Sequence, residues 1–205
     1  MKEKVIIFSM IAAMIMVITV TGSNSAFAVD WRFPVGLTYI SNFQDIADLH
    51  ENNLEAEGNV TTSTDAVPVG LAFNPYVEFD FGLGIGIGVG PLMMVLGDTE
   101  FINVPLKFDV RYAIPQLSVS PYVRAGVSYN AASGDYVESS TPGLFLAGGV
   151  EFLRNKVVGF GLELSYDSSE IEFEKYTASS YYYGYTSEPE KIKPGEFTIS
   201  LYAVF

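Results

Sequence analysis

Phe101 to Ile114 reads FINVPLKFDVRYAI, and this stretch decides the fold class. Successive side chains of a β-strand point to opposite faces. On that spacing one face is wholly apolar: Ile102, Val104, Leu106, Phe108, Val110, Tyr112 and Ile114. The opposite face holds the polar and charged residues Asn103, Lys107, Asp109 and Arg111. The stretch therefore predicts a long strand with an apolar face and a charged face.

Seven further segments between Trp31 and Phe205 show the same alternation. They begin near Trp31, Val67, Leu83, Val119, Leu144, Val158 and Phe197. Each is close to the roughly 9–11 residues that a tilted strand needs to cross a bilayer. The connections alternate between short turns and longer loops, the latter at residues 42–66, 95–100, 131–142 and 168–195. We therefore predict an all-β fold, an eight-stranded antiparallel up-and-down transmembrane β-barrel.

The first 28 residues have the form of a secretory signal peptide. Two lysines precede the uncharged stretch Val5–Val20, and Ala26-Phe27-Ala28 supplies a small-residue cleavage site. We expect residues 1–28 to be the cleaved signal peptide and residues 29–205 to be the barrel domain. Short turns are typical of the periplasmic rim, so both termini are expected there and the long loops outside.

Composition excludes several functions. The chain has no cysteine and one histidine, so we expect no metal site, thiolate chemistry or cofactor. Its net charge is -13, which gives no electrostatic basis for binding nucleic acid. An apolar fraction near half, combined with acidic loops, is typical of a membrane barrel.

A soluble sandwich or lipocalin-like barrel would also alternate, but the glycines argue against both. Gly82, Gly84, Gly86, Gly88 and Gly90 share one face of a predicted strand. On an exposed surface they would only weaken the strand. Facing a narrow lumen they make room for bulky neighbours, and Tyr76 and Tyr122 are inward candidates.

The predicted lumen carries a dense set of charges. Its members are Arg32, Glu78, Asp80, Lys107, Asp109, Arg111, Arg124, Glu151, Glu163, Asp167 and Glu196. They could line an ion path, or they could pair into a structural plug. An eight-stranded interior is only wide enough for side chains to fill, which favours the plug.

Two loop features leave alternatives open. His50 lies beside Asp48 and Glu51 in the first loop, where we interpret it as a solvated residue and not as a catalytic one. Beyond Ser168 the alternation changes phase at Ile171 and Phe173, which indicates a bulge or a strand that has left the bilayer. The tyrosines of this last loop predict either a binding patch or a hairpin above the membrane.

The end of the chain supports a family resemblance. Ile199, Leu201 and Phe205 resemble the C-terminal signal that the barrel assembly machinery reads in bacterial outer-membrane proteins. The segment from 29 to 205 resembles small eight-stranded barrels typified by OmpX, OmpW and the OmpA transmembrane domain. The resemblance implies a Gram-negative outer-membrane location with lipid and lipopolysaccharide as partners, bridged by divalent cations at the acidic loops.

The resemblance also frames the functional alternatives. It implies a non-enzymatic role in envelope structure or surface interaction. Trp31-Arg32 is similar to the start of OmpW-type barrels, which implies passage of small hydrophobic molecules as an alternative. A lipid-modifying enzyme is the third alternative, although the surroundings of His50 do not match the lipid A deacylase pattern.

Overall fold

The structure is a computed structural model, and it describes residues 29–59, 67–96, 99–115, 117–154, 156–179 and 184–205. The predicted signal peptide lies outside these residues. No helix within the described ranges has the length and apolar character to span a bilayer.

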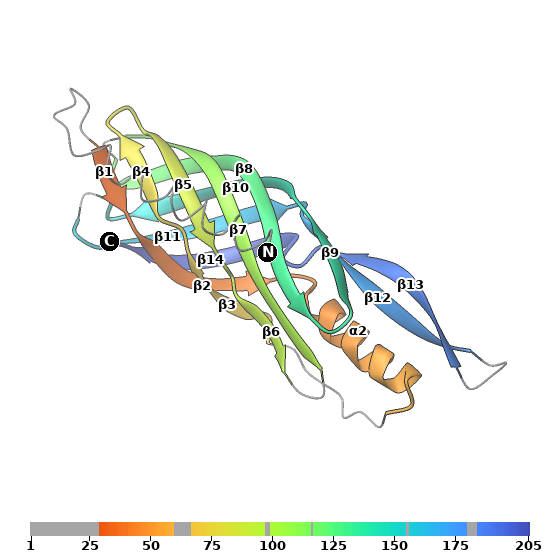
Figure 1. Cartoon of the computed structure of the whole chain (residues 1–205). Helices are drawn as coiled ribbons and strands as arrows, with labels where there is room; N and C mark the ends of the chain where they lie inside the picture. The colour runs from red at the N-terminus through yellow and green to blue at the C-terminus, as the bar shows by residue number, and fades with distance from the viewer. Residues whose placement is uncertain (1–28, 60–66, 97–98, 116, 155, 180–183) are drawn as a thin grey trace.

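The described residues form a closed eight-stranded antiparallel barrel, as predicted (Figure 1). Its wall consists of β1 (Val29–Arg32) with β2 (Pro34–Ile40), β3 (Val69–Phe73) with β4 (Tyr76–Phe79), β5 (Leu83–Val89) with β6 (Met93–Leu96), β7 (Glu100–Ala113), β8 (Val119–Gly134), β10 (Gly143–Phe152), β11 (Gly159–Asp167) and β14 (Phe197–Val204). Strand β14 pairs with β2 and closes the sheet on itself. Closure leaves few free edges, which stabilises a barrel against unwanted pairing.

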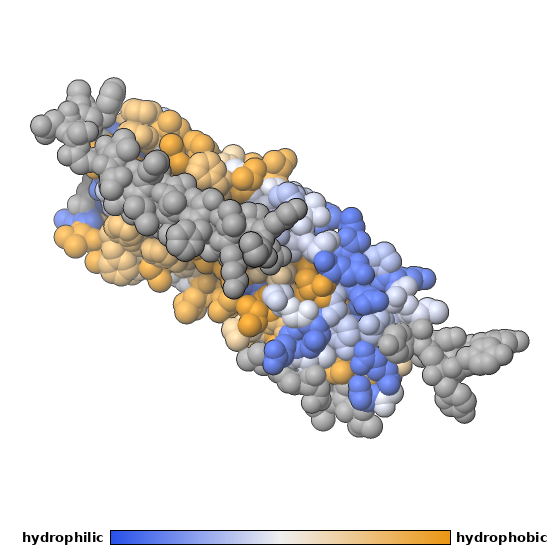
Figure 2. All heavy atoms as spheres, in the orientation of Figure 1, coloured by the Kyte–Doolittle hydropathy of each residue, from blue (hydrophilic) through white to orange (hydrophobic). Residues whose placement is uncertain are grey.

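The outer surface of the barrel is apolar. Phe108, Val123 and Leu201 project outward and are 52 %, 61 % and 64 % exposed, whereas their strand neighbours are buried or half-buried inside. Apolar residues cover the barrel end of the molecule, and hydrophilic residues gather at the opposite end (Figure 2). This distribution inverts that of a water-soluble barrel, whose apolar side chains lie inside.

A second, smaller unit, here called the cap, lies at one end of the barrel. It comprises α2 (Phe43–Ala56) and a three-stranded sheet of β9 (Val137–Thr141), β12 (Glu170–Ser179) and β13 (Gly184–Ile192). The C-terminus and β1 lie at the other end (Figure 1). Apolar residues of the cap share one core with the ends of β2, β6 and β7: Ile40, Phe43, Ile46, Leu49, Met93, Val95, Phe101, Ile171, Phe173 and Ile192.

Three details of the cap differ from the sequence-based expectation or resolve it. The first loop contains the helix α2, which strand periodicity could not reveal. The last loop is the hairpin β12–β13, and Ile171 and Phe173 change phase because β12 leaves the barrel sheet for the cap. The alternation of the predicted strand from Leu83 onward places Met93 on the outer face, but Met93 is 1 % exposed and packs in the cap core, because the alternation shifts by one residue between Gly90 and Pro91.

One boundary of the barrel wall is incompletely paired. Among the described residues, strand β3 pairs with β5 only at Phe73 and Val89, and β6 pairs only with β7. Between β3 and β6 the Leu92 amide donates one long hydrogen bond, 3.4 Å, to the Leu71 carbonyl. We call this boundary the seam.

Candidate functional site: the lumen plug

The middle of the lumen is occupied by Arg111 from β7. Its guanidinium lies 3.6 Å from the ring centroid of Tyr122 and 4.5 Å from that of Tyr76. Nη2 of Arg111 is 2.7 Å from Oε1 of Glu151, and the Tyr76 hydroxyl donates to the same oxygen at 2.9 Å. Arg111 and Glu151 are each 2 % exposed. A buried cation between two aromatic faces and a carboxylate is strongly held.

Glycines on neighbouring strands make this arrangement possible. Tyr76 is paired in register with Gly86, Tyr122 with Gly149, and Tyr202 with Gly161. A Cβ atom added at Gly161 would lie 2.1 Å from the Tyr202 ring, and one at Gly149 would lie 2.5 Å from the Tyr122 hydroxyl. Each tyrosine therefore lies across an inward glycine, a device that fills a barrel interior.

Arg124 from β8 forms the next layer. Its Nε and Nη2 donate to the two oxygens of Asp109 at 2.9 and 2.6 Å, and its Nη1 donates to Glu163 at 2.9 and 3.1 Å. The Tyr122 hydroxyl also donates to Glu163, at 2.8 Å. This planar fork with two carboxylates is the geometry in which arginine binds carboxylate best.

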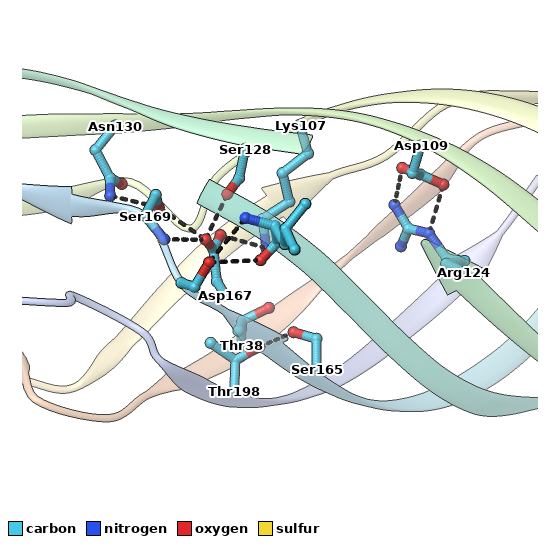
Figure 3. A network of polar contacts seen from close by, with 12 residues as sticks. Thr38, Lys107, Asp109, Arg124, Ser128, Asn130, Ser165, Asp167, Ser169 and Thr198 are labelled. Atoms are coloured by element: carbon cyan, nitrogen blue, oxygen red, sulfur yellow. Dashed lines mark hydrogen bonds and ion pairs between the residues drawn. The ribbon is translucent and has the colours of Figure 1, made fainter. Parts of the chain in front are cut away.

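A polar layer above Arg124 connects the charges to the cap (Figure 3). Lys107 lies 3.9 Å from Asp167 and 4.2 Å from the centroid of the Phe145 ring. Asp167 also accepts hydrogen bonds from the Ser128 hydroxyl and from the hydroxyl and amide of Ser169. All the donors that Asp167 needs are thus supplied by the barrel wall and the start of the cap.

Arg154 closes the other end of the charged region. Its Nη2 is paired with Glu78, its Nη1 donates to the Ser120 hydroxyl at 2.7 Å, and its Nε lies 3.8 Å from Glu151. Arg154 follows the end of β10 at Phe152, in a connection that the alternation predicts to be a short turn. Its side chain is nevertheless 6 % exposed, because it reaches back into the lumen.

The structure therefore brings eight of the eleven predicted lumen residues together inside the barrel. They are Glu78, Lys107, Asp109, Arg111, Arg124, Glu151, Glu163 and Asp167. Of the other three, Asp80 and Glu196 differ from the prediction. Asp80 is exposed beyond the end of β4, and Glu196 is half-exposed and 3.9 Å from Lys193 beside the cap. Arg32 is paired in register with the inward Tyr76, and it lies at the end of the lumen, where it pairs with Asp30 at 2.5 Å and its Nη1 donates to the Arg154 carbonyl at 3.2 Å.

Arg154 and Tyr202 contact predicted lumen residues but were absent from the site prediction. Tyr202 could have been found, because it lies on the inward parity of β14 opposite Gly161. Arg154 follows the last strand residue Phe152, so its direction could not be inferred from alternation. With Arg154 included, four buried cations face five buried carboxylates among the described residues.

Little space remains in this part of the lumen. A cavity of about 10 Å³ lies among Tyr76, Arg111, Arg124, Glu163 and Tyr202. Roughly this volume is needed for a single water molecule. We call the four cations, their carboxylate partners and the three tyrosines the lumen plug. Over the described residues, no group of three or more His, Asp or Glu side chains is placed to hold a metal ion.

His50 departs most clearly from its predicted setting. It was expected in solvent, but it is 2 % exposed on the inner face of α2. Nδ1 lies 2.9 Å from the Thr99 hydroxyl, whereas Nε2 has no hydrogen-bond partner among the described residues. A hydrolytic site would require a carboxylate at that second nitrogen and access for substrate. Within the described ranges no carboxylate is bonded to Nε2, and the ring is buried.

A closed eight-stranded barrel with an apolar outer face and an ion-paired interior defines the architecture of small transmembrane barrels. The fold is similar to that in the crystal structure of the outer membrane protein OprG from Pseudomonas aeruginosa, with a TM-score of 0.54. The match covers 87 % of this chain and 95 % of that one at 13 % sequence identity. The likeness is therefore one of fold. No protein-family model and no curated protein matches the chain.

Proposed function

We propose that the protein is a non-enzymatic barrel of the Gram-negative outer membrane that is closed to ions and serves envelope structure or surface interaction. The apolar outer face supports the membrane location, because it suits hydrocarbon and not water. Lipid and lipopolysaccharide then surround the barrel. In this orientation both termini are periplasmic and the acidic cap is extracellular, where divalent cations bridge it to lipopolysaccharide.

The observation that carries the proposal is the position of Arg111. Its guanidinium stands between Tyr76 and Tyr122 in the middle of the lumen and is 2 % exposed. An ion crossing the barrel would have to displace a buried charge from two rings and from Glu151. The penalty for leaving Glu151 unpaired makes such displacement rare.

Planar-bilayer recording on refolded protein tests this proposal. We expect no steady conductance from the unaltered barrel, with an open porin as the positive control for insertion. Insertion is verified separately by protection of the barrel from protease in liposomes. A steady single-channel current from correctly inserted protein would contradict the closed plug.

A second function is favoured by the seam: lateral passage of small hydrophobic molecules. Within the part of the chain that the structure describes, one long backbone hydrogen bond bridges the seam, and Met93 and Val95 of β6 point inward beside it into the cap core. An apolar molecule entering between β3 and β6 would meet apolar side chains and would bypass the lumen plug. This route is compatible with an absence of ion conductance.

A disulfide across the seam distinguishes the two functions. The chain lacks cysteine, so Leu71→Cys with Leu92→Cys introduces one unique pair at the Leu71–Leu92 hydrogen bond. Uptake of a hydrophobic fluorophore into liposomes is measured in the oxidised and the reduced protein. Uptake that stops on oxidation supports lateral passage, whereas equal uptake in both states supports the purely structural role.

A further inference from the structure

The cap contains one ionisable ring buried in an aromatic cluster. His50 lies with ring centroids 5.8 Å from Phe101, 5.3 Å from Tyr136 and 6.1 Å from Phe173. These three residues come from β7, from the turn between β8 and β9, and from β12. The imidazole therefore packs against aromatic side chains from three segments outside α2.

Asn53 supplies the polar contacts that attach α2 to β12. The pairing of β9 with β12 ends at Phe173. Beyond that residue, the Asn53 side chain bonds the backbone of β12. Its Nδ2 donates to the Glu174 carbonyl at 2.6 Å, and its Oδ1 accepts from the Tyr176 amide at 2.7 Å. Apolar side chains of α2, namely Phe43, Ile46 and Leu49, add contacts in the cap core. Whether α2 stays docked thus depends on the cap core, of which His50 is part.

Charging the ring is unfavourable in this position. Protonated imidazole has two N–H donors, but Nε2 has no acceptor within the described residues and is shielded from water. Burial therefore lowers the pKa of His50 from 6.5 to about 4, although Asp135 acts in the opposite direction. The other titratable groups around the cluster are Glu57 and Tyr136, which are hydrogen bonded to each other, Glu100 beside Thr99, and Glu174 and Tyr176 on β12.

We propose that His50 makes the cap an acid-sensitive latch, in which protonation of the imidazole releases α2 from the β9–β12–β13 sheet while the barrel stays closed. The barrel strands are held by their own hydrogen-bonded ladders, which are interrupted at the seam, and by the lumen plug, and His50 belongs to neither. The docked cap holds the ring neutral, and the released cap lets it take up a proton in water.

The sign and size of the effect follow from linkage. The group has the lower pKa when the cap is docked, so docking is fully favoured above pH 6.5 and weakens as the pH falls toward 4. The ratio of released to docked cap is expected to rise on the order of a hundredfold over this interval. This proposal does not depend on whether the barrel conducts ions or passes hydrophobic molecules.

A distance measurement on the full barrel tests the latch. Asp48 on α2 and Glu188 on β13 are exposed, and substitution of both with cysteine allows two spin labels to be attached in a chain without other cysteines. Electron–electron resonance in lipid nanodiscs should give one short distance above pH 6.5 and a growing longer population toward pH 4. An unchanged distance distribution down to pH 4 would overturn the proposal.

The matched control is His50→Gln in the same labelled background. Glutamine can still bond Thr99 but does not titrate, so its distance distribution should not change with pH. Release of α2 at the same pH in this variant would assign the effect to Asp135, Glu57 or Glu174 and overturn the role of His50. If His50→Gln does not fold, His50→Phe fits the aromatic cluster and serves the same comparison.

Fluorescence of Trp31 is followed in parallel, because this single tryptophan lies in β1 and reports on the barrel. A Trp31 signal that stays constant while α2 is released supports the latch. Simultaneous loss of both signals would mean acid unfolding of the whole protein and would contradict it.

Discussion

Replacing Arg111 with methionine tests the lumen plug most directly. Methionine approximates the length of arginine but removes the charge, so Glu151 keeps only the Tyr76 hydroxyl at 2.9 Å and a distant Arg154 at 3.8 Å. Breaking a buried ion pair by removing one partner costs about 3–5 kcal/mol. Because Glu151 retains two partial partners, we expect a loss near the lower end, about 3 kcal/mol.

The double variant Arg111→Met with Glu151→Gln separates charge pairing from packing. It removes both charges and leaves a neutral amide that can still accept from Tyr76. Replacement of a whole buried pair by neutral groups is often close to neutral in stability. We therefore expect the double variant to recover at least about 2 kcal/mol of the loss in the single variant.

Urea unfolding in liposomes, followed by Trp31 fluorescence, measures the free energy of unfolding of all three proteins. Bilayer recording of the single variant should also show intermittent current where the unaltered barrel shows none. If Arg111→Met were as stable as the unaltered protein, and the double variant showed no difference from either, Arg111 and Glu151 would not form a structural plug.

Three further predictions concern the wall of the barrel and its assembly. Phe108→Arg, on the outer face near the middle of β7, should destabilise the inserted barrel by about 2–4 kcal/mol. The control Thr177→Arg, on the exposed part of β12, should change the free energy of unfolding in urea little. Equal losses in the two variants would contradict a membrane-facing surface at Phe108. Gly149→Ala should lower the free energy of unfolding by about 1–3 kcal/mol, because the added Cβ would lie 2.4 Å from the Leu162 carbonyl oxygen. The adjacent outward variant Gly148→Ala should have little effect, since the atom nearest to its Cβ is 3.9 Å away. A larger loss in Gly148→Ala than in Gly149→Ala would refute the inward position of Gly149. Deleting Phe205 should lower the amount of protein in the outer membrane of cells without altering the circular dichroism of the folded fraction, and unchanged membrane levels would argue against an assembly signal.

The barrel could be predicted from sequence because its two faces meet different surroundings. On β7, Phe108 and Val110 are 52 % and 46 % exposed, and Asp109 between them is 1 % exposed, as the period of two requires. The same rule failed at Met93, which packs in the cap core, whereas the change of phase at Ile171 correctly indicated a strand that has left the barrel sheet. Alternation predicts which residues share a face of a strand. It does not predict whether that face packs in the lumen, in the cap core or against lipid.

Which lumen residues form ion pairs with each other was harder to predict than which residues face the lumen. Arg111 and Glu151 come from β7 and β10, which are separated by β8 in the wall. Their contact depends on the registers of two intervening strand pairs and on the curvature that brings them across the lumen. Each register is set by many weak side-chain contacts, so pairing cannot be read from one strand alone.

His50 shows why the cap was the least predictable part of the chain. Helical spacing of Phe43, Ile46 and Leu49 was present in the sequence, but a helix of this length is marginal without tertiary contacts. Those contacts come from β7, the β8–β9 turn and β12, which are distant in sequence from α2. Because His50 lies near Asp48 and Glu51 in the sequence, it was expected to be solvated. It is buried only because α2, β7, the β8–β9 turn and β12 come together. Burial by these four segments also makes protonation of His50 unfavourable. The tertiary packing that cannot be inferred from the sequence is therefore the packing on which an acid-sensitive cap depends.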